Sequence, residues 1–107
     1  MVTNIDKIAP EPQAYADYRP LFETSRLNVT HVRIRPGETV PAHVHADEDQ
    51  AYYVVSGQGF VELNSKRTDV HAGSAVLIPM GTEHLIANTG ADPLDYVFFV
   101  VFVPERT

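Results

Sequence analysis

Short runs of hydrophobic and β-branched residues, separated by turn-forming residues, follow one another from Leu27 onward. The intervals between the runs contain Gly, Pro or Asn, which end strands and form turns. No window in this part of the chain has a helical period. The pattern predicts an all-β domain, a sandwich or barrel of short strands. The predicted strands cover residues 27–35, 50–55, 60–63, 75–78, 84–88 and 96–103.

The two ends of the chain differ from this pattern. Pro10, Pro12 and Pro20 disfavour a helix near the N-terminus. We therefore expect residues 1–26 to form an extended strap over the body or over a partner subunit, and residues 27–107 to form the barrel. Residues 96–103 are apolar at every position. Because alternate side chains of a strand face opposite sides, both faces of this strand need a cover. This predicts a homodimer.

Composition narrows the functional classes. A chain of 107 residues has room for one domain, and the absence of cysteine excludes disulfides, thiolate metal sites and thiol nucleophiles. The net charge of -6 argues against a nucleic-acid partner. The apolar runs are too short for a membrane helix, which needs about 20 residues, and no secretory signal is visible. We expect a cytoplasmic protein with no membrane or nucleic-acid partner.

The sequence His43-Val-His45 is the first candidate for chemistry. Residues i and i+2 of a strand face the same side, so both imidazoles can reach one ion. Neutral imidazole is a common ligand for transition metals. The pair on its own only suggests a metal site.

Further residues surround this pair in an order that resembles the two-part signature of the cupin family, G-x5-H-x-H-x3-4-E-x6-G followed by G-x5-P-x-G-x2-H-x3-N. The matching residues are Gly37, His43, His45 and Gly57, then Gly73, Pro79, Gly81, His84 and Asn88. The resemblance implies an antiparallel jelly-roll barrel, the double-stranded β-helix. It also implies one divalent transition metal per chain (Zn, Fe, Ni or Mn) that is bound by His43, His45 and His84.

The sequence departs from this family where glutamate is usual, because it has Gln50. We assign Gln50 as the fourth metal ligand through its amide oxygen, with Asp49 and Glu48 as carboxylate alternatives. Strand alternation argues against Asp49, which faces away if positions 50 and 52 face inward. Three imidazoles and an amide leave the ion with its full +2 charge, which favours anionic ligands. The acidic stretch 47–49 could reduce this charge if it covers the mouth, but a solvated loop is the simpler expectation.

Two further residues are candidate catalytic groups. Tyr52 lies two positions after Gln50, so it is expected to face the same cavity, as a proton donor or as a wall residue. Arg33 could clamp a carboxylate if the polar side of its strand lines the cavity. In the opposite orientation, Val32 and Ile34 face inward and Arg33 faces solvent.

The leading functional hypothesis is a metalloenzyme for a small oxygenated, anionic molecule, with isomerase or lyase chemistry on a sugar acid or keto acid. A metal-dependent dioxygenase is the alternative among enzymes. A metal-bearing module that binds a small molecule without turnover is the alternative outside them, because a fold does not determine a function.

Overall fold

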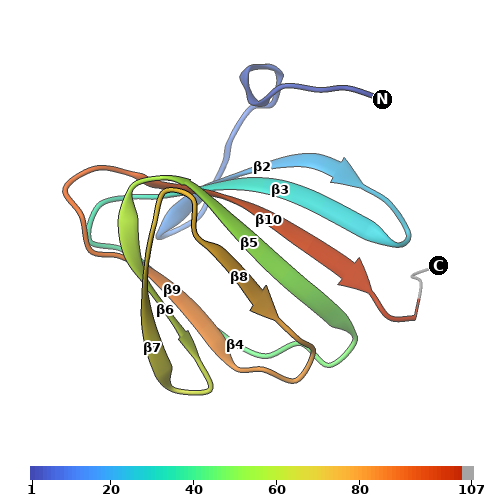
Figure 1. Ribbon diagram of the computed structural model, residues 1–107. Helices are drawn as coiled ribbons and strands as arrows, with labels where there is room; N and C mark the ends of the chain where they lie inside the picture. The colour runs from blue at the N-terminus through green and yellow to red at the C-terminus, as the bar shows by residue number, and fades with distance from the viewer. Residues whose placement is uncertain (105–107) are drawn as a thin grey trace.

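Two antiparallel sheets face each other in the computed structural model, which describes residues 1–104 (Figure 1). The larger sheet has the strand order β1-β2-β3-β10-β5-β8, and the smaller has the order β4-β9-β6-β7. The elements are the 3-10 turn η1 (Ile5–Lys7), β1 (Glu11–Pro12), β2 (Ala16–Glu23), β3 (Leu27–Ile34), β4 (Thr39–His43), β5 (Glu48–Ser56), β6 (Gln58–Leu63), β7 (Lys66–His71), β8 (Ala75–Ile78), β9 (His84–Asn88) and β10 (Leu94–Phe102). The expected all-β jelly roll is confirmed.

The hydrophobic core lies between the two sheets. In β5 and β8, buried side chains alternate with side chains that are partly or fully exposed. The fully buried core residues of the larger sheet include Val32, Ile34, Val54 and Leu94, which meet Ile86 of the smaller sheet. This core fills the space between the two sheets with apolar side chains.

Two segments of the backbone approach each other closely where β5 ends and β10 begins. Gly57 has a φ of +90°, and a Cβ atom at this position would lie 2.5 Å from the carbonyl oxygen of Pro93. Only glycine fits this backbone conformation and this close approach. Asn88 secures the same region, because its side-chain amide donates to the carbonyls of Ile34 and Asp92.

Residues 1–26 contain one long strand. β2 pairs with β3 along its edge, with a bulge between Pro20 and Phe22, and its first residue, Ala16, is completely buried. This part of the predicted strap therefore lies beside β3 in the plane of the sheet. β1 pairs with the beginning of β2, whereas η1 and the residues before it stand apart from the sheet in Figure 1. They are tied to it by a hydrogen bond from Arg19 Nε to the Ile8 carbonyl.

β10 occupies the middle of the larger sheet, between β3 and β5. Its inward residues Tyr96 and Val100 are buried, whereas Val97 and Phe99 are half-buried and Val101 is exposed. One apolar face of β10 thus meets the core, and the other lies on the outer surface of the sheet. Within residues 1–104, no helix has the length and hydropathy that are needed to cross a membrane.

Candidate metal centre

Three histidine side chains meet at one end of the smaller sheet. His43 ends β4 and is the register partner of His84, which begins β9, and His45 follows two residues after His43. The ring centroid of His84 lies 4.2 Å from that of His43 and 5.7 Å from that of His45. One nitrogen from each ring lies within 4.8 Å of the other two. The three predicted histidines are therefore brought together and could hold one metal ion.

The loop that carries His45 is tied to the turn that precedes His84. The backbone N–H of Gly81 donates to the carbonyl of His45 over 2.7 Å. Gly81 has a φ of +82°, a left-handed conformation that glycine adopts without strain. This contact joins the β4–β5 and β8–β9 loops, so the positions of two of the histidines depend on each other.

Hydrogen bonds determine which nitrogen of two rings is available. His43 Nδ1 lies 2.8 Å from the carbonyl oxygen of Pro41, and His84 Nδ1 lies 2.9 Å from that of Thr82. A carbonyl oxygen only accepts, so in both rings Nδ1 carries the proton and Nε2 keeps its lone pair. His84 Nε2 is buried and has no hydrogen-bond partner. This is the state in which imidazole binds a metal.

The electrostatic surroundings favour a neutral His84. Burial lowers the pKa of this imidazole below its usual value, and the neighbouring His43 and His45 lower it further, although the hydrogen bond to Thr82 and the charge of Glu48 oppose them. A neutral ring at neutral pH can donate its lone pair to a cation. The burial of His84 therefore suits a ligand role.

Gln50 approaches the cluster from the larger sheet. Its side chain is 2% exposed, and its Nε2 donates to Glu48 Oε2. Only the NH₂ end of an amide can donate to a carboxylate, so this bond assigns the orientation of the amide. The remaining atom, Oε1, is buried without a hydrogen-bond partner. An amide oxygen is thus left free next to Glu48, whose other oxygen lies 3.8 Å from His45 Nδ1.

The acidic stretch before Gln50 does not form a solvated loop throughout. Glu48 is 8% exposed, and its Oε1 lies 3.8 Å from His45 Nδ1. Asp49 lies on the other face of β5, where it accepts a hydrogen bond from the backbone of Met80. Asp49 is therefore directed away from the cluster, as strand alternation predicts, whereas Glu48 contacts two of the candidate ligands.

Tyr52 lies on the same inner face of β5 as Gln50. Its side chain is 4% exposed, and its ring packs against Tyr96 at 4.7 Å and Phe98 at 5.5 Å. The ring of His84 lies 6.4 Å away in an edge-to-face arrangement. Burial raises the pKa of the Tyr52 hydroxyl, with smaller contributions from Tyr18 and Glu48. This residue therefore keeps its proton and can act as a donor.

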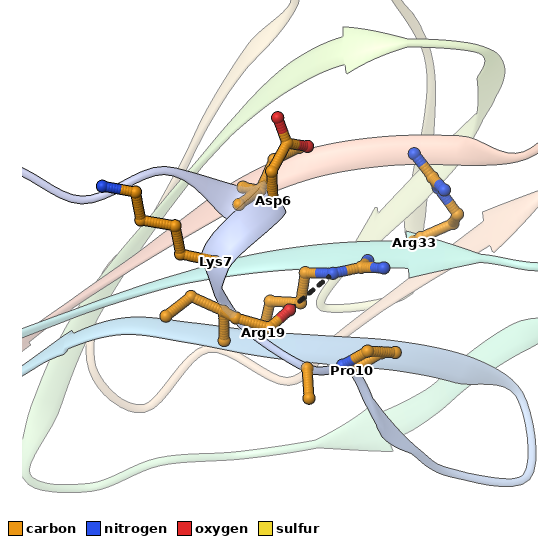
Figure 2. A pocket seen from close by; sticks show the side chains of 8 residues that line it. Asp6, Lys7, Pro10, Arg19 and Arg33 are labelled. Carbon is orange, nitrogen blue, oxygen red and sulfur yellow. Dashed lines mark hydrogen bonds between the residues drawn. The ribbon is translucent and has the colours of Figure 1, made fainter.

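Arg33 is not brought to the histidines. Val32 and Ile34 face the core, so Arg33 projects from the outer face of β3, where it forms two hydrogen bonds of 2.8 and 3.0 Å with Asp95. Figure 2 shows Arg19 and Arg33 beside η1, where they line a cavity of about 580 Å³ with residues 5–10. Of the two orientations that the sequence leaves open for this strand, the structure adopts the one that turns Arg33 away from the cluster.

From the sequence, Glu48 was expected only as an alternative metal ligand, and its contacts with Gln50 and His45 were not predicted. The predicted strand begins at Gln50, whereas β5 begins at Glu48. In a strand that starts two residues earlier, positions 48, 50 and 52 share one face. The alternation of the strand, continued two residues toward the N-terminus, would therefore have predicted that Glu48 faces the same side as Gln50.

Comparisons with known proteins agree with this geometry. A family model described as "Cupin domain" matches residues 30–102. An oxalate-binding protein of Thermotoga maritima is 29% identical over 72 residues, which are 67% of this chain and 60% of the relative. The tetracenomycin polyketide synthase protein TcmJ of Streptomyces glaucescens is 27% identical over 99 residues, which are 88% of this chain and 66% of the relative.

The chain spans only part of these relatives. It also matches the Escherichia coli mannose-1-phosphate guanylyltransferase, at 29% identity, but covers 18% of that protein. Among solved structures, a predicted oxalate decarboxylase from Thermotoga maritima has a TM-score of 0.91 at 23% identity, over 96% of this chain and all of the other. The polyketide cyclase RemF from Streptomyces resistomycificus has a TM-score of 0.82 at 19% identity, over 94% of this chain and 78% of the other. These structures share the fold.

Proposed function

The chain belongs to the cupin family, and from this premise we propose that it binds one divalent transition metal per chain and acts on a small oxygenated anion. The ligands are His43, His45, His84 and Gln50. The observation that carries the proposal is the convergence of three imidazoles, with one nitrogen from each within 4.8 Å of the other two. His84 Nε2 and Gln50 Oε1 are in addition buried without hydrogen-bond partners. Leaving such atoms unpaired is costly unless a ligand satisfies them.

The donor set fits a borderline transition metal. Imidazole nitrogens suit Zn²⁺, Fe²⁺ and Ni²⁺, and one amide oxygen is compatible with each of them. When bound, the ion supplies Lewis acidity toward a carboxylate, carbonyl or hydroxyl oxygen of the substrate. Three neutral imidazoles and a neutral amide leave its charge uncompensated by the ligands, and Glu48 contributes one negative charge nearby. The positive balance favours an anionic substrate.

The substrate is small and approaches from the side of His43 and His45. These two side chains are half-buried, whereas His84 and Gln50 are fully buried against the core. Tyr52 closes the inner end with its aromatic neighbours and keeps its proton, so it would donate a hydrogen bond to a substrate oxygen. The name of the Thermotoga relative, an oxalate-binding protein, supports a compact carboxylate as the class of ligand.

Within this class we propose isomerase or lyase chemistry on a sugar acid or keto acid. Such a reaction needs a polarised oxygen and a proton donor, and the centre with Tyr52 supplies both. A dioxygenase would use the same three histidines, and a binding module would need no proton donor. Turnover without oxygen supports the isomerase or lyase, oxygen consumption supports the dioxygenase, and saturable binding without turnover supports the module.

The first experiment is metal analysis of purified protein after incubation with Zn²⁺, Fe²⁺, Ni²⁺ or Mn²⁺. We expect one ion per chain in the parent protein. Gln50→Ala should weaken the affinity about tenfold, which corresponds to about 1.4 kcal/mol for one lost ligand. A parent protein that binds none of these ions, or a double variant His43→Ala/His45→Ala that binds as well as the parent, would overturn the assignment.

We also propose that a second copy of the chain covers the outer face of the larger sheet. This face carries exposed apolar side chains on adjacent strands, with exposed fractions of 49% for Tyr53, 68% for Leu77 and 45% for Val101. A two-fold axis would place this patch against itself in an isologous interface. Light scattering at micromolar concentration should give the mass of a dimer, and Tyr53→Lys/Leu77→Lys should give a monomer. A monomeric parent contradicts this assembly.

A further inference from the structure

Glu48 is a buried carboxylate next to the candidate centre. Its side chain is 9% exposed, although it lies at the beginning of a strand in an acidic stretch. Burying a carboxylate costs free energy unless its oxygens find partners. Both oxygens have a polar neighbour, because Oε2 accepts from Gln50 Nε2 and Oε1 lies 3.8 Å from His45 Nδ1. These neighbours are two of the four proposed metal ligands.

The contact with Gln50 determines what this amide offers to a cation. An amide presents either an oxygen, which can bind a metal, or an NH₂ group, which cannot. With Nε2 donating to Glu48, the oxygen is the free end, and it is the atom found buried without a partner. Removing the carboxylate removes the preference between the two orientations. The negative charge at position 48 thus selects the amide orientation that can coordinate.

The contact with His45 has the same consequence. A carboxylate near Nδ1 favours the tautomer that carries its proton on Nδ1, which leaves Nε2 to bind a metal. The carbonyls of Pro41 and Thr82 do this for His43 and His84. At 3.8 Å, Glu48 Oε1 is too distant for a hydrogen bond, but it places a negative charge beside His45 Nδ1, the position that a carbonyl oxygen takes in the other two rings. With Glu48 included, each of the four proposed ligands has an oxygen beside its non-coordinating nitrogen, by a hydrogen bond in His43, His84 and Gln50 and by charge at 3.8 Å in His45.

We propose that Glu48 is the positioning residue of the metal centre: without coordinating the ion, it orients Gln50 and His45 and supplies a negative charge next to the site. This role rests on the proposed metal-binding function. In this chain the carboxylate lies at position 48, two residues before position 50, where the cupin signature has glutamate. The charge balance of the centre is then set by Glu48 and Gln50 together, since one has the charge and the other has the coordinating oxygen.

The test compares three variants by Zn²⁺ titration against a competing chelator. Glu48→Gln removes the charge with little change in shape, and we expect it to weaken Zn²⁺ binding by 10- to 100-fold, the usual range for the loss of a group that orients a ligand. Asp49→Asn is the matched control, because it removes a neighbouring charge on the opposite face and keeps an oxygen for Met80. This control should change the affinity less than about twofold.

The third variant moves the carboxylate to the coordinating position. In Glu48→Gln/Gln50→Glu the amide at position 48 can donate to the carboxylate at position 50, and Zn²⁺ affinity should return to within about threefold of the parent. A role in folding alone would not predict this rescue. The side-chain amide NMR signals of Gln50 in the metal-free protein give an independent readout, and they should shift in Glu48→Gln but not in Asp49→Asn.

The outcomes separate the two proposals. A parent protein that binds no Zn²⁺ overturns the metal-binding function, and the role of Glu48 falls with it. A parent that binds Zn²⁺ while Glu48→Gln binds equally well overturns the role of Glu48 alone. Weak binding by Glu48→Gln without rescue in the double variant also contradicts the positioning role, because it indicates a general loss of structure at this end of β5.

Discussion

His31 and His84 are both nearly completely buried, and each has one ring nitrogen without a hydrogen-bond partner. Burial lowers the pKa of both imidazoles. Their surroundings differ. His84 faces two other imidazoles with ring centroids at 4.2 and 5.7 Å, whereas His31 lies on the outer face of β3, with its Nε2 3.9 Å from Asp95 Oδ2.

The difference between them shows what makes a buried histidine a candidate ligand. Burial and an unpaired nitrogen are common to both positions, so neither feature identifies a metal site. The charges next to His31 include two cations, Arg19 and Arg33, which disfavour a bound metal ion. At His84 the neighbouring rings are those of His43 and His45. The hydrogen bonds of Nδ1 in His43 and His84 leave the Nε2 atoms of both rings free to coordinate. Convergence of such donors is the distinguishing feature.

The largest expected effect separates the two histidines directly. His84→Ala should lower Zn²⁺ affinity at least about 100-fold, because it removes one of three imidazole ligands, a loss of at least about 2.7 kcal/mol. His31→Ala should leave the affinity within about twofold of the parent. It should instead lower the free energy of unfolding by about 1–3 kcal/mol, the usual cost of emptying a buried position. Calorimetric Zn²⁺ titration and urea unfolding measure these two quantities.

Equal loss of Zn²⁺ affinity in both variants would contradict the distinction, because it would mean that the outer face also supports the centre. Retained affinity in His84→Ala would remove His84 from the ligand set. Circular dichroism of the variants provides the control for folding.

The next effect is expected at both His31 and His84, because protonating a buried imidazole costs free energy in the folded protein. In the metal-free protein the pKa of both histidines is lowered in the folded state, so below about pH 6.5 the unfolded chain binds more protons. The free energy of unfolding should therefore fall as pH is lowered from 6.5 toward 5, by up to about 1.4 kcal/mol per pH unit for each histidine. Urea unfolding at several pH values measures the slope, and His31→Ala should reduce it. A free energy of unfolding that rises over this interval would contradict the expectation.

The inner face of the barrel could be predicted from the sequence because its strands alternate clearly. The predicted runs 75–78 and 84–88 coincide with β8 and β9, and the spacing of the glycines and histidines identified the family. The three histidines converge as the resemblance implied. The alternation of apolar residues along the strand and the spacing of the motif residues were sufficient for this prediction, because both are visible within a few neighbouring residues.

The edges of the sheets could not be predicted in the same way. β7 has Val70 as its one buried residue, and β2 contains Pro20 and a bulge, so neither shows the period of a half-buried strand. β7 is an edge strand, and β2 beyond Tyr18 has only β3 as a partner, because β1 pairs with Asp17 and Tyr18 alone. Strands that pair on one side only tolerate proline and charge. The partner of Arg33 also could not be predicted from the sequence. Asp95 is 62 residues away, and only the register between β3 and β10 brings it opposite Arg33.

A smaller effect tests the outer ion pair against the inner site. Arg33→Gln removes two hydrogen bonds to Asp95, but the arginine side chain is 40% exposed, so solvent already screens the pair. We expect a loss of about 1 kcal/mol in the free energy of unfolding and no change in Zn²⁺ affinity beyond about twofold. Thermal unfolding and Zn²⁺ titration provide the two readouts. A large drop in Zn²⁺ affinity would place Arg33 in the function of the centre despite its position on the opposite face.

The smallest effect is expected at Tyr52. Its ring packs in the core, and its hydroxyl is the proposed hydrogen-bond donor to the substrate. Tyr52→Phe keeps the packing against Tyr96 and Phe98, so the free energy of unfolding should change by less than about 1 kcal/mol. Zn²⁺ affinity should stay within about twofold, because no proposed ligand is lost. The affinity of the Zn²⁺-loaded protein for oxalate should fall about fivefold, the equivalent of one neutral hydrogen bond of about 1 kcal/mol. Calorimetric titration of oxalate into the loaded parent and variant gives this ratio. Equal oxalate affinities would assign Tyr52 to the wall of the barrel, and a parallel loss of Zn²⁺ would show that its hydroxyl supports the histidines instead.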